Sequence, residues 1–187
     1  MIQEILFVLV SIVLIAVSWR PLRERQSHGF FRFFAWEALA ALILLNLPAW
    51  FRNPFSVLQI ISWLLLFGSI FMAVHGFWLL KQVGKPQPSP KNVSPEFAAN
   101  YAFENTSTLV TIGAYRTIRH PMYSSLLLLG MGTYLKDVSI FATLLLGVEI
   151  IFLYLTARIE EKENLVRFGE SYAGYMKGTR MFIPFIF

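Results

Sequence analysis

Five long apolar runs dominate this chain of 187 residues. They occupy residues 2–19, 30–50, 54–80, 121–135 and 138–157. A helix needs about 20 apolar residues to cross the hydrocarbon core of a bilayer. Four of the runs reach roughly this length, and the run 121–135 is slightly short. The pattern predicts an all-α integral membrane protein with about five transmembrane helices.

The composition agrees with a membrane protein and excludes several kinds of site. Hydrophobic residues make up 56% of the chain and charged residues only 14%, whereas a soluble domain carries about 25% charged residues. The absence of cysteine excludes disulfides, cysteine–zinc sites and thiol nucleophiles. The three histidines are too scattered along the sequence to suggest a metal site, so no metal is expected.

The basic residues are distributed unevenly about the five runs. Only Arg52 and Lys136, of 16 basic residues, fall in the two short loops on one side. The other 14 lie on the opposite side, which the positive-inside rule assigns to the cytosol. We therefore expect the N-terminus outside and the C-terminus inside, and no nucleic-acid partner. The start of the first run, Met1-Ile2-Gln3-Glu4, has no positive segment, so this run is expected to be retained as a span.

The long cytosolic segment between the third and fourth runs carries most of the polar sequence. It opens with a proline-rich linker at 84–90, and Ser94 followed by Pro95 is typical of a helix start. Residues 109–115 suggest an extended piece that turns at Gly113, and Pro121 suits the first turn of the fourth helix. We expect three variable spans in 1–80, and a core in 81–187 that comprises this loop, a helical hairpin at 121–157 and a tail helix.

Two motifs in the C-terminal half resemble a known enzyme family. Residues 113–123 read GAYRTIRHPMY, and Glu160-Glu161 is followed by FGESYAGY at 168–175, then by Arg180 and Pro184. This combination resembles the isoprenylcysteine carboxyl methyltransferase family and the related phospholipid methyltransferases, over about 109–184. Ala114, Ser125 and Asn164 depart from the family pattern through substitutions.

The resemblance implies an integral-membrane enzyme that transfers a methyl group from S-adenosyl-L-methionine to a lipid-like or apolar acceptor, without a metal. It places the cofactor site on the cytosolic side. His120 is expected to bind the cofactor's carboxylate, Glu160 its ammonium, and the backbone of Leu109 and Val110 its adenine. The full set of residues that the resemblance assigns to the cofactor is Ser107, Thr108, Leu109, Val110, Tyr115, His120, Pro121, Met122, Tyr123 and Glu160.

The acceptor side is less defined by the sequence. Thr156 stands where the prenylcysteine enzymes have an arginine that contacts the substrate, and Arg158 lies about 200° further around the helix. A prenylcysteine carboxylate, a phospholipid amine, a small thiol or another apolar nucleophile all remain open as acceptors. Glu149 shares a helix face with Glu160, and we expect Glu149 and Arg158 to act at the acceptor side. No role follows for Glu37 or His75, and the oligomeric state is open.

An aromatic stripe and two other function classes complete the expectations. Leu165, Phe168, Tyr172 and Tyr175 follow Glu161 at helical spacing, and we expect them to pack against the loop or the membrane interface. A membrane reductase of the sterol reductase type, which binds NADPH, is an alternative, although the Glu160-Glu161 pair favours methyl transfer. A non-enzymatic membrane protein is the other alternative. The expected partners are the bilayer and a membrane lipid or apolar small molecule.

Overall fold

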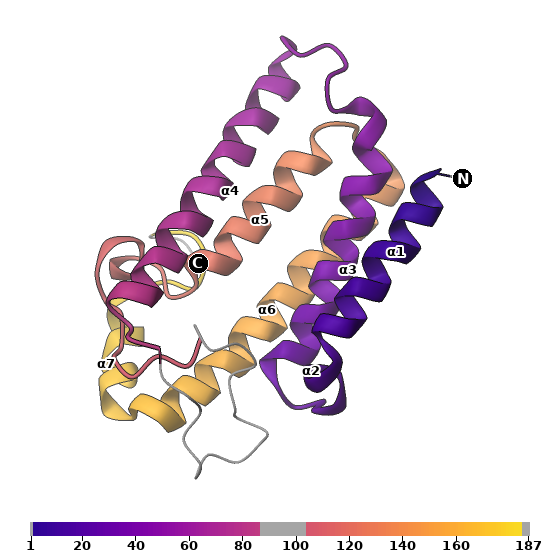
Figure 1. Ribbon diagram of the computed structural model, residues 1–187. Helices are drawn as coiled ribbons and strands as arrows, with labels where there is room; N and C mark the ends of the chain where they lie inside the picture. Colours follow the sequence, from indigo (N-terminus) through magenta and orange to yellow (C-terminus); the bar gives the residue numbers. More distant parts are fainter. Residues whose placement is uncertain (1, 87–103, 185–187) are drawn as a thin grey trace.

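The computed structural model describes residues 2–86 and 104–184, and these residues form a helical bundle (Figure 1). The described part contains no β-strands, only isolated bridges between Pro86 and Thr106 and between Ile118 and Arg180. The helices are α1 (Ile2–Val17), α2 (Trp19–Arg23), α3 (His28–Asn46), η1 (Leu47–Ala49), α4 (Val57–Gln82), η3 (Gly113–Arg116), α5 (Pro121–Tyr134), α6 (Ile140–Phe168) and α7 (Glu170–Gly178).

The all-α fold class expected from the five apolar runs is confirmed, and each run corresponds to one helix. Three helical segments in the described residues, His28–Ala49, Val57–Gln82 and Ile140–Phe168, are long and apolar enough to cross a membrane. α1 is a shorter apolar helix, and α5 has 14 residues. The chain is therefore a membrane protein.

Local capping residues set where the long helices begin. The hydroxyl groups of Ser27, Ser56 and Ser139 accept hydrogen bonds from backbone N–H groups in the first turns of α3, α4 and α6. Pro121 occupies the first turn of α5, as its sequence position predicts. α3 thus starts two residues before the first residue of its apolar run, and α4 starts three residues after the first residue of its own run. In both helices a capping serine, and not hydrophobicity, sets the boundary.

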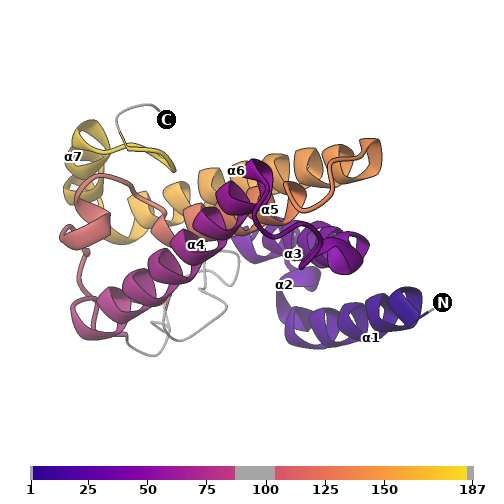
Figure 2. The ribbon, with the colours of Figure 1, turned by 90° about the horizontal axis from the view of Figure 1, so that it is seen from above.

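The helices pack in two closely joined pairs. α3 lies along α6, α4 lies along α5, and contacts between α5 and α6 connect the two pairs (Figure 1). α1 packs against α3 at the side of the bundle, and none of its described residues is buried (Figure 2). α4 exposes large apolar side chains, among them Phe67, Phe71 and Val74. Such surfaces fit a lipid environment and not water.

A polar cluster joins the helix ends near the loop between α5 and α6. The side-chain amide of Asn46 donates to Thr133 O at 2.8 Å, and Lys136 Nζ donates to Gln59 Oε1 at 3.0 Å. Lys136 Nζ also lies 3.7 Å from the centroid of the Trp63 ring. Burial lowers the pKa of Lys136. These contacts hold α3, α4 and α5 together at the end of the bundle opposite to the motif residues.

The other end of the bundle is built by the C-terminal part of α6 and by the segments around it. α6 continues without interruption to Phe168 and so carries Glu160 beyond the apolar run. The chain then turns at Gly169, whose φ of +55° favours glycine, and enters α7. The tail helix expected from the sequence is α7. The helix start expected at Ser94 and Pro95 lies outside the described residues.

Candidate active site

A cavity of about 370 Å³ lies where the motif residues meet the helix bundle. This volume is within the usual range for small-molecule sites, about 300–1,000 Å³. Side chains from α3, α4, α5, α6 and α7 line it, together with the loop that follows residue 103. The lining residues include Arg32, Trp36, Ala73, Leu80, Glu104, Leu109, Val110, Tyr115, Arg119, His120, Met122, Tyr123, Leu126, Glu160, Asn164, Phe168, Tyr172 and Tyr175.

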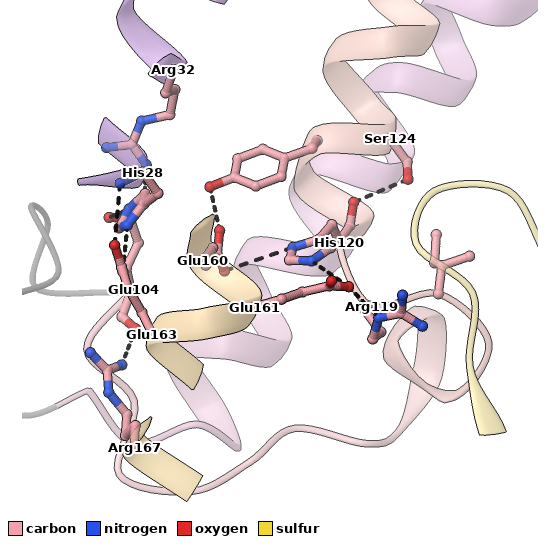
Figure 3. Close-up of polar contacts among 12 residues, drawn as sticks. His28, Arg32, Glu104, Arg119, His120, Ser124, Glu160, Glu161, Glu163 and Arg167 are labelled. Carbon is pink, nitrogen blue, oxygen red and sulfur yellow. Dashed lines mark hydrogen bonds and ion pairs between the residues drawn. The ribbon is translucent and has the colours of Figure 1, made fainter. Parts of the chain in front are cut away.

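His120 lies at the centre of the polar contacts in this cavity (Figure 3). The residue caps α5 and is only 4% exposed. Its Nδ1 is 3.8 Å from Glu160 Oε1, and its Nε2 is 3.6 Å from Glu161 Oε1. Its ring stacks on Tyr123 with centroids 5.4 Å apart. Nε2 is buried and faces the carboxylate of Glu161, so the imidazole lies between the two glutamates of the motif.

The C-terminal segment fixes the backbone around His120. Arg119 N donates to Arg180 O at 2.7 Å, and His120 N donates to Met181 O at 3.1 Å. The hydroxyl of Ser124 donates to Phe182 O at 2.8 Å. These bonds explain why the second half of the motif follows so far along the sequence: residues 180–182 hold the histidine segment against α5.

The two adjacent glutamates of the motif have different surroundings. Glu160 faces the cavity, and the hydroxyl of Tyr123 donates a hydrogen bond to its Oε2 (Figure 3). Glu161 points toward Arg119, whose Nε donates to Glu161 Oε1 at 2.6 Å. Arg119 also donates to Thr179 O at 2.6 Å. Glu160 is therefore placed to contact a ligand. Glu161 instead connects α6, through Arg119, to the segment before α5 and to the end of α7.

A second polar cluster lies where α3 approaches α6. Glu104 forms an ion pair with Arg32 and lies 3.5 Å from His28 Nε2. His28 Nδ1 is 2.6 Å from Glu163 Oε2, and Arg167 donates to the backbone carbonyl of Glu104 at 3.0 Å. Burial alone would raise the pKa of Glu104, but the charge of Arg32 and the hydrogen bonds from His28 and Arg32 outweigh it and lower that pKa.

Aromatic side chains form another part of the cavity wall. Tyr115, Phe168, Tyr172 and Tyr175 line it, and the hydroxyl of Tyr175 donates to Tyr115 O at 2.5 Å. Burial, with a further contribution from the charge of Glu160, raises the pKa of Tyr115 and that of Tyr172. Burial also raises the pKa of Tyr175. All three tyrosines are therefore neutral phenols at physiological pH. Tyr175 packs against the loop as expected, through its bonds to Tyr115 O and Ile118 O, and the structure adds that Phe168, Tyr172 and Tyr175 also line the cavity.

Most of the residues expected to bind a cofactor line this cavity. They are Leu109, Val110, Tyr115, His120, Met122, Tyr123 and Glu160. Ser107, Thr108 and Pro121 are not among the lining residues. The hydroxyl of Ser107 donates to Lys85 O at 3.0 Å, and Thr108 N donates to Gly84 O at 3.2 Å. These two residues thus attach the loop to the end of α4, and Pro121 starts α5.

The two residues expected at the acceptor side do not line the cavity. Arg158 is exposed. Glu149 is fully buried, and its carboxylate lies against Gly130 of α5, so closely that a Cβ on Gly130 would overlap with it. Thr156 is also buried and donates to Phe152 O at 2.7 Å. Glu149 and Glu160 thus share a face of α6 but have different surroundings. Glu149 packs against α5, and only Glu160 lines the cavity.

Glu37 and His75, whose roles could not be predicted, are also not among the residues that line the cavity. Glu37 Oε2 accepts a hydrogen bond from Ser11 at 2.7 Å, which links α1 to α3. The ring of His75 stacks on Phe71 with centroids 5.7 Å apart. His75 also approaches Gly113, where the chain turns with a φ of +60°. A side chain at position 113 would meet the imidazole, so glycine is required there.

Several lining residues were missed at the level of sequence. Arg32 and Trp36 belong to α3, and Glu104 belongs to the loop before the motif. Arg32 was interpreted only as a topology signal. The available signal was the spacing of His28, Arg32 and Trp36, which are four residues apart and therefore share one face of the helix that follows the first loop. The spacing does not show which helix packs against this face, because that depends on the tertiary structure.

A comparison with family models supports the resemblance. The model of the phospholipid methyltransferase family matches residues 92–170. This stretch includes Glu104, the segment around His120, all of α5 and α6, and both Glu160 and Glu161. Searches among curated proteins and among solved structures found no match. Residues 92–170 of this membrane protein therefore match the phospholipid methyltransferase family, and this match suggests a membrane methyltransferase.

Proposed function

We propose that this protein transfers a methyl group from S-adenosyl-L-methionine to a lipid-like acceptor. The observation that carries the proposal is the set of residues that line the cavity described above. One part of its wall holds His120 and Glu160, and another part is apolar and belongs to the membrane helices. Such a cavity suits two reactants of opposite character, a charged donor from the cytosol and an apolar acceptor from the bilayer.

The residues present fit the donor. S-adenosyl-L-methionine carries an ammonium, a carboxylate, an adenine and a sulfonium. Glu160 offers a carboxylate to the ammonium, and the imidazole of His120, which also lines the cavity, would meet the carboxylate. Such charge-assisted hydrogen bonds are stronger than neutral ones. Leu109 and Val110 provide backbone groups and apolar surface for the adenine.

Methyl transfer from this donor requires the protein mainly to position the two reactants. The donor supplies a methyl group that its positive sulfur has already activated. The protein has to align the nucleophile with this methyl group and keep water away. Tyr123 holds the carboxylate of Glu160 through its hydroxyl. The rings of Tyr115, Phe168 and Tyr172 offer π faces that attract a cation.

The packing of the helices supports an acceptor that enters from the bilayer. Ala73 and Leu80 of α4 line the cavity, as do Trp36 of α3 and Leu126 of α5. In the described part of the chain, α3 packs on α6 and α4 packs on α5, while α3 and α4 are not a closely packed pair. The side of the cavity between α3 and α4 is therefore the natural entry for an apolar molecule.

The positions of the charges support a cytosolic site in this proposal. Arg52 and Asp137 pair at 3.1 Å at the end of the bundle that holds the short loops, and Lys136 lies at the same end. Arg119 and His120 lie just before α5 and Glu160 lies in the C-terminal part of α6, at the other end of the bundle (Figure 1). The sequence segments expected on that side carry most of the basic residues. The positive-inside rule then puts the N-terminus outside and the cavity at the cytosolic face.

Ligand binding to the purified protein tests this proposal against the reductase alternative. Thermal unfolding in detergent is measured with S-adenosylhomocysteine and with NADPH. We expect S-adenosylhomocysteine to raise the unfolding temperature, and Glu160→Gln and His120→Ala to remove this effect. The exposed Glu170 of α7 provides the matched control Glu170→Gln, which should bind normally. Stabilisation by NADPH alone would overturn the proposal in favour of a reductase.

A further inference from the structure

A second, smaller cavity, the basic pocket, lies at the end of the bundle where α7 is found (Figure 1). Its volume is about 230 Å³. The residues that line it are Arg116, Thr117, Lys177, Gly178 and Arg180, and none of them lines the larger cavity. The basic pocket is therefore formed by two segments far apart in the sequence, one at the end of η3 and the other at the end of α7 and just beyond it.

The charges of the basic pocket are all of one sign. Three of its five lining residues are cationic, and no carboxylate is among the five. Arg116, Lys177 and Arg180 are exposed, and no hydrogen bond or ion pair joins their side chains to another residue of the described part of the chain. Three positive charges around one pocket repel one another. A bound anion would remove this repulsion and would accept charge-assisted hydrogen bonds from both segments.

The packing of η3 on α4 indicates how deep in the bilayer the basic pocket lies. Gly113, the first residue of η3, approaches α4 so closely that a Cβ there would be 2.7 Å from both His75 Nε2 and Leu79 Cδ1. Leu79 is three residues before the end of the apolar helix α4, and the neighbouring Trp78 is 54% exposed. Exposed tryptophans are typical of the boundary between the hydrocarbon core and the lipid headgroups. The basic pocket, which begins three residues after Gly113, therefore lies at the level of the headgroups.

We propose that the basic pocket binds the phosphate group of an anionic membrane lipid and thereby holds η3 against the segment that follows α7. Charge complementarity selects an anion, and the depth of the pocket selects one that belongs to the bilayer. Ile112, immediately before η3, is 51% exposed, so apolar surface for acyl chains lies beside the cations. Basic pockets at the cytosolic membrane surface bind anionic headgroups in this way. The lipid bound here is not the methyl acceptor, because the basic pocket and the larger cavity share no lining residue.

The two segments joined by the lipid are those that position His120. Arg180 N donates to Thr117 O at 3.0 Å, and Arg119 N donates to Arg180 O at 2.7 Å. The next bond in the same series runs from His120 N to Met181 O at 3.1 Å. An anion held by cations of both segments acts in parallel with these three backbone bonds. Lipid binding should therefore reduce the local opening of the bonds around His120.

Three probes separate the contribution of the anion from that of the acyl chains. They are dioctanoyl phosphatidylglycerol, dioctanoylglycerol, which lacks the phosphate, and glycerol 3-phosphate, which lacks the chains. Native mass spectrometry of the full-length protein in a non-ionic detergent gives the affinity for each probe. We expect dioctanoyl phosphatidylglycerol to bind about tenfold or more tightly than either of the other two, since it alone offers both groups.

Substitutions assign this binding to the basic pocket. The combined variant Arg116→Gln, Lys177→Gln and Arg180→Gln should weaken dioctanoyl phosphatidylglycerol about tenfold or more. The matched control replaces three exposed cations outside the pocket, Arg25, Lys81 and Lys162, by Gln and so changes the net charge equally. The control should keep the affinity within about twofold of the unchanged protein.

A single substitution serves if the combined variant does not fold. Lys177→Gln alone should weaken dioctanoyl phosphatidylglycerol about fivefold relative to Lys162→Gln, as expected for one cation near a lipid headgroup. Equal affinities of these two single variants would count against the proposal.

Hydrogen–deuterium exchange tests whether the lipid holds the two segments together. In the unchanged protein, dioctanoyl phosphatidylglycerol should slow exchange about threefold or more in peptides that cover residues 116–121 and 178–183. It should have no such effect in the combined variant. Lipid binding without slower exchange in these peptides would contradict the link between the basic pocket and the His120 segment.

Three binding results would overturn the proposal. Equal affinity for dioctanoylglycerol would mean that the acyl chains alone determine binding. Equal affinity for glycerol 3-phosphate would identify a site for soluble phosphates and not for a lipid. An equal loss in the combined variant and in its matched control would indicate only the general attraction of a basic protein for an anion. None of these results depends on S-adenosylhomocysteine, so failure of the methyl-transfer proposal and failure of the lipid site are distinguishable.

Discussion

Arg119 and Glu161 form a largely buried ion pair, with Arg119 Nε 2.6 Å from Glu161 Oε1, immediately beside the glutamate that faces the cavity. The pair connects the residue before His120 to α6, and the same arginine reaches the end of α7 through Thr179 O. Glu161 thus supports the structure, whereas its neighbour Glu160 is placed to contact a ligand. Substitutions of the two residues can distinguish these roles.

Removing Glu161 should destabilise the protein, whereas removing the charge of Glu160 should not. Glu161→Ala leaves the guanidinium of Arg119 without its carboxylate partner, which costs about 3 kcal/mol for a buried pair. Glu160→Gln keeps the shape of a side chain that is 29% exposed. Thermal unfolding and S-adenosylhomocysteine binding are measured for both. Similar unfolding temperatures for the two variants would contradict the division of roles.

The contact between Gly130 and Glu149 gives a test of packing inside the membrane region. A methyl group on Gly130 would overlap with the buried carboxylate of Glu149, so Gly130→Ala should force α5 and α6 apart and lower the unfolding temperature. Gly147 provides the control, since nothing lies within 4 Å of a Cβ built there. Gly147→Ala should be neutral or slightly stabilising because alanine favours helix. Equal effects of the two substitutions would show that the packing described here is wrong.

Glu149→Gln tests the remaining expectation that this residue acts on the acceptor. Its carboxylate is fully buried and does not line the cavity. We expect turnover within about twofold of the unchanged protein, since a group that does not touch the reactants contributes little to the barrier. A drop in turnover of about a hundredfold or more, with unaltered unfolding temperature, would restore an acceptor role for Glu149.

The hydroxyl of Tyr123 offers a test of how Glu160 is positioned. Tyr123→Phe removes the hydrogen bond to Glu160 and keeps the ring that stacks on His120. We expect the affinity for S-adenosylhomocysteine to fall about tenfold, as for the loss of one hydrogen bond to a charged group. Tyr134→Phe, at the far end of α5, is the matched control. Unchanged affinity in Tyr123→Phe would mean that this hydroxyl does not position Glu160.

The ion pair of Glu104 predicts a dependence of stability on pH. The pKa of Glu104 is lowered in the folded protein, mainly by Arg32 against the effect of burial. A lowered carboxyl pKa contributes stability above the unfolded-state value of about 4.3 and loses it as the pH falls further. The difference in unfolding temperature between the unchanged protein and Glu104→Gln should therefore be largest near neutral pH and shrink below about pH 4.3. A difference that stays constant from pH 7 to pH 3.5 would contradict the ion pair.

The helices and the motif residues could be predicted from the sequence because their signals are local. Apolar length gave the five helices, and Pro121 gave the start of α5. Apolar length did not predict the starts of α3 and α4, because these starts depend on capping by Ser27 and Ser56. The contact of the aromatic stripe with the loop could be predicted, but its place in the cavity wall could not, because that depends on the turn at Gly169. Arg32 and Glu104 meet only through the packing of α3 on α6, which no local pattern encodes.

The most direct test of methyl transfer uses the purified protein, a total membrane lipid extract and S-adenosyl-L-methionine with an isotopically labelled methyl group, followed by mass spectrometry of the products. We expect a labelled lipid-like product that is absent with Glu160→Gln and present with Glu170→Gln. A protein that binds S-adenosylhomocysteine but yields no labelled product from any extract fraction would contradict the lipid-like acceptor. Equal labelling by the Glu160→Gln variant would contradict the site itself.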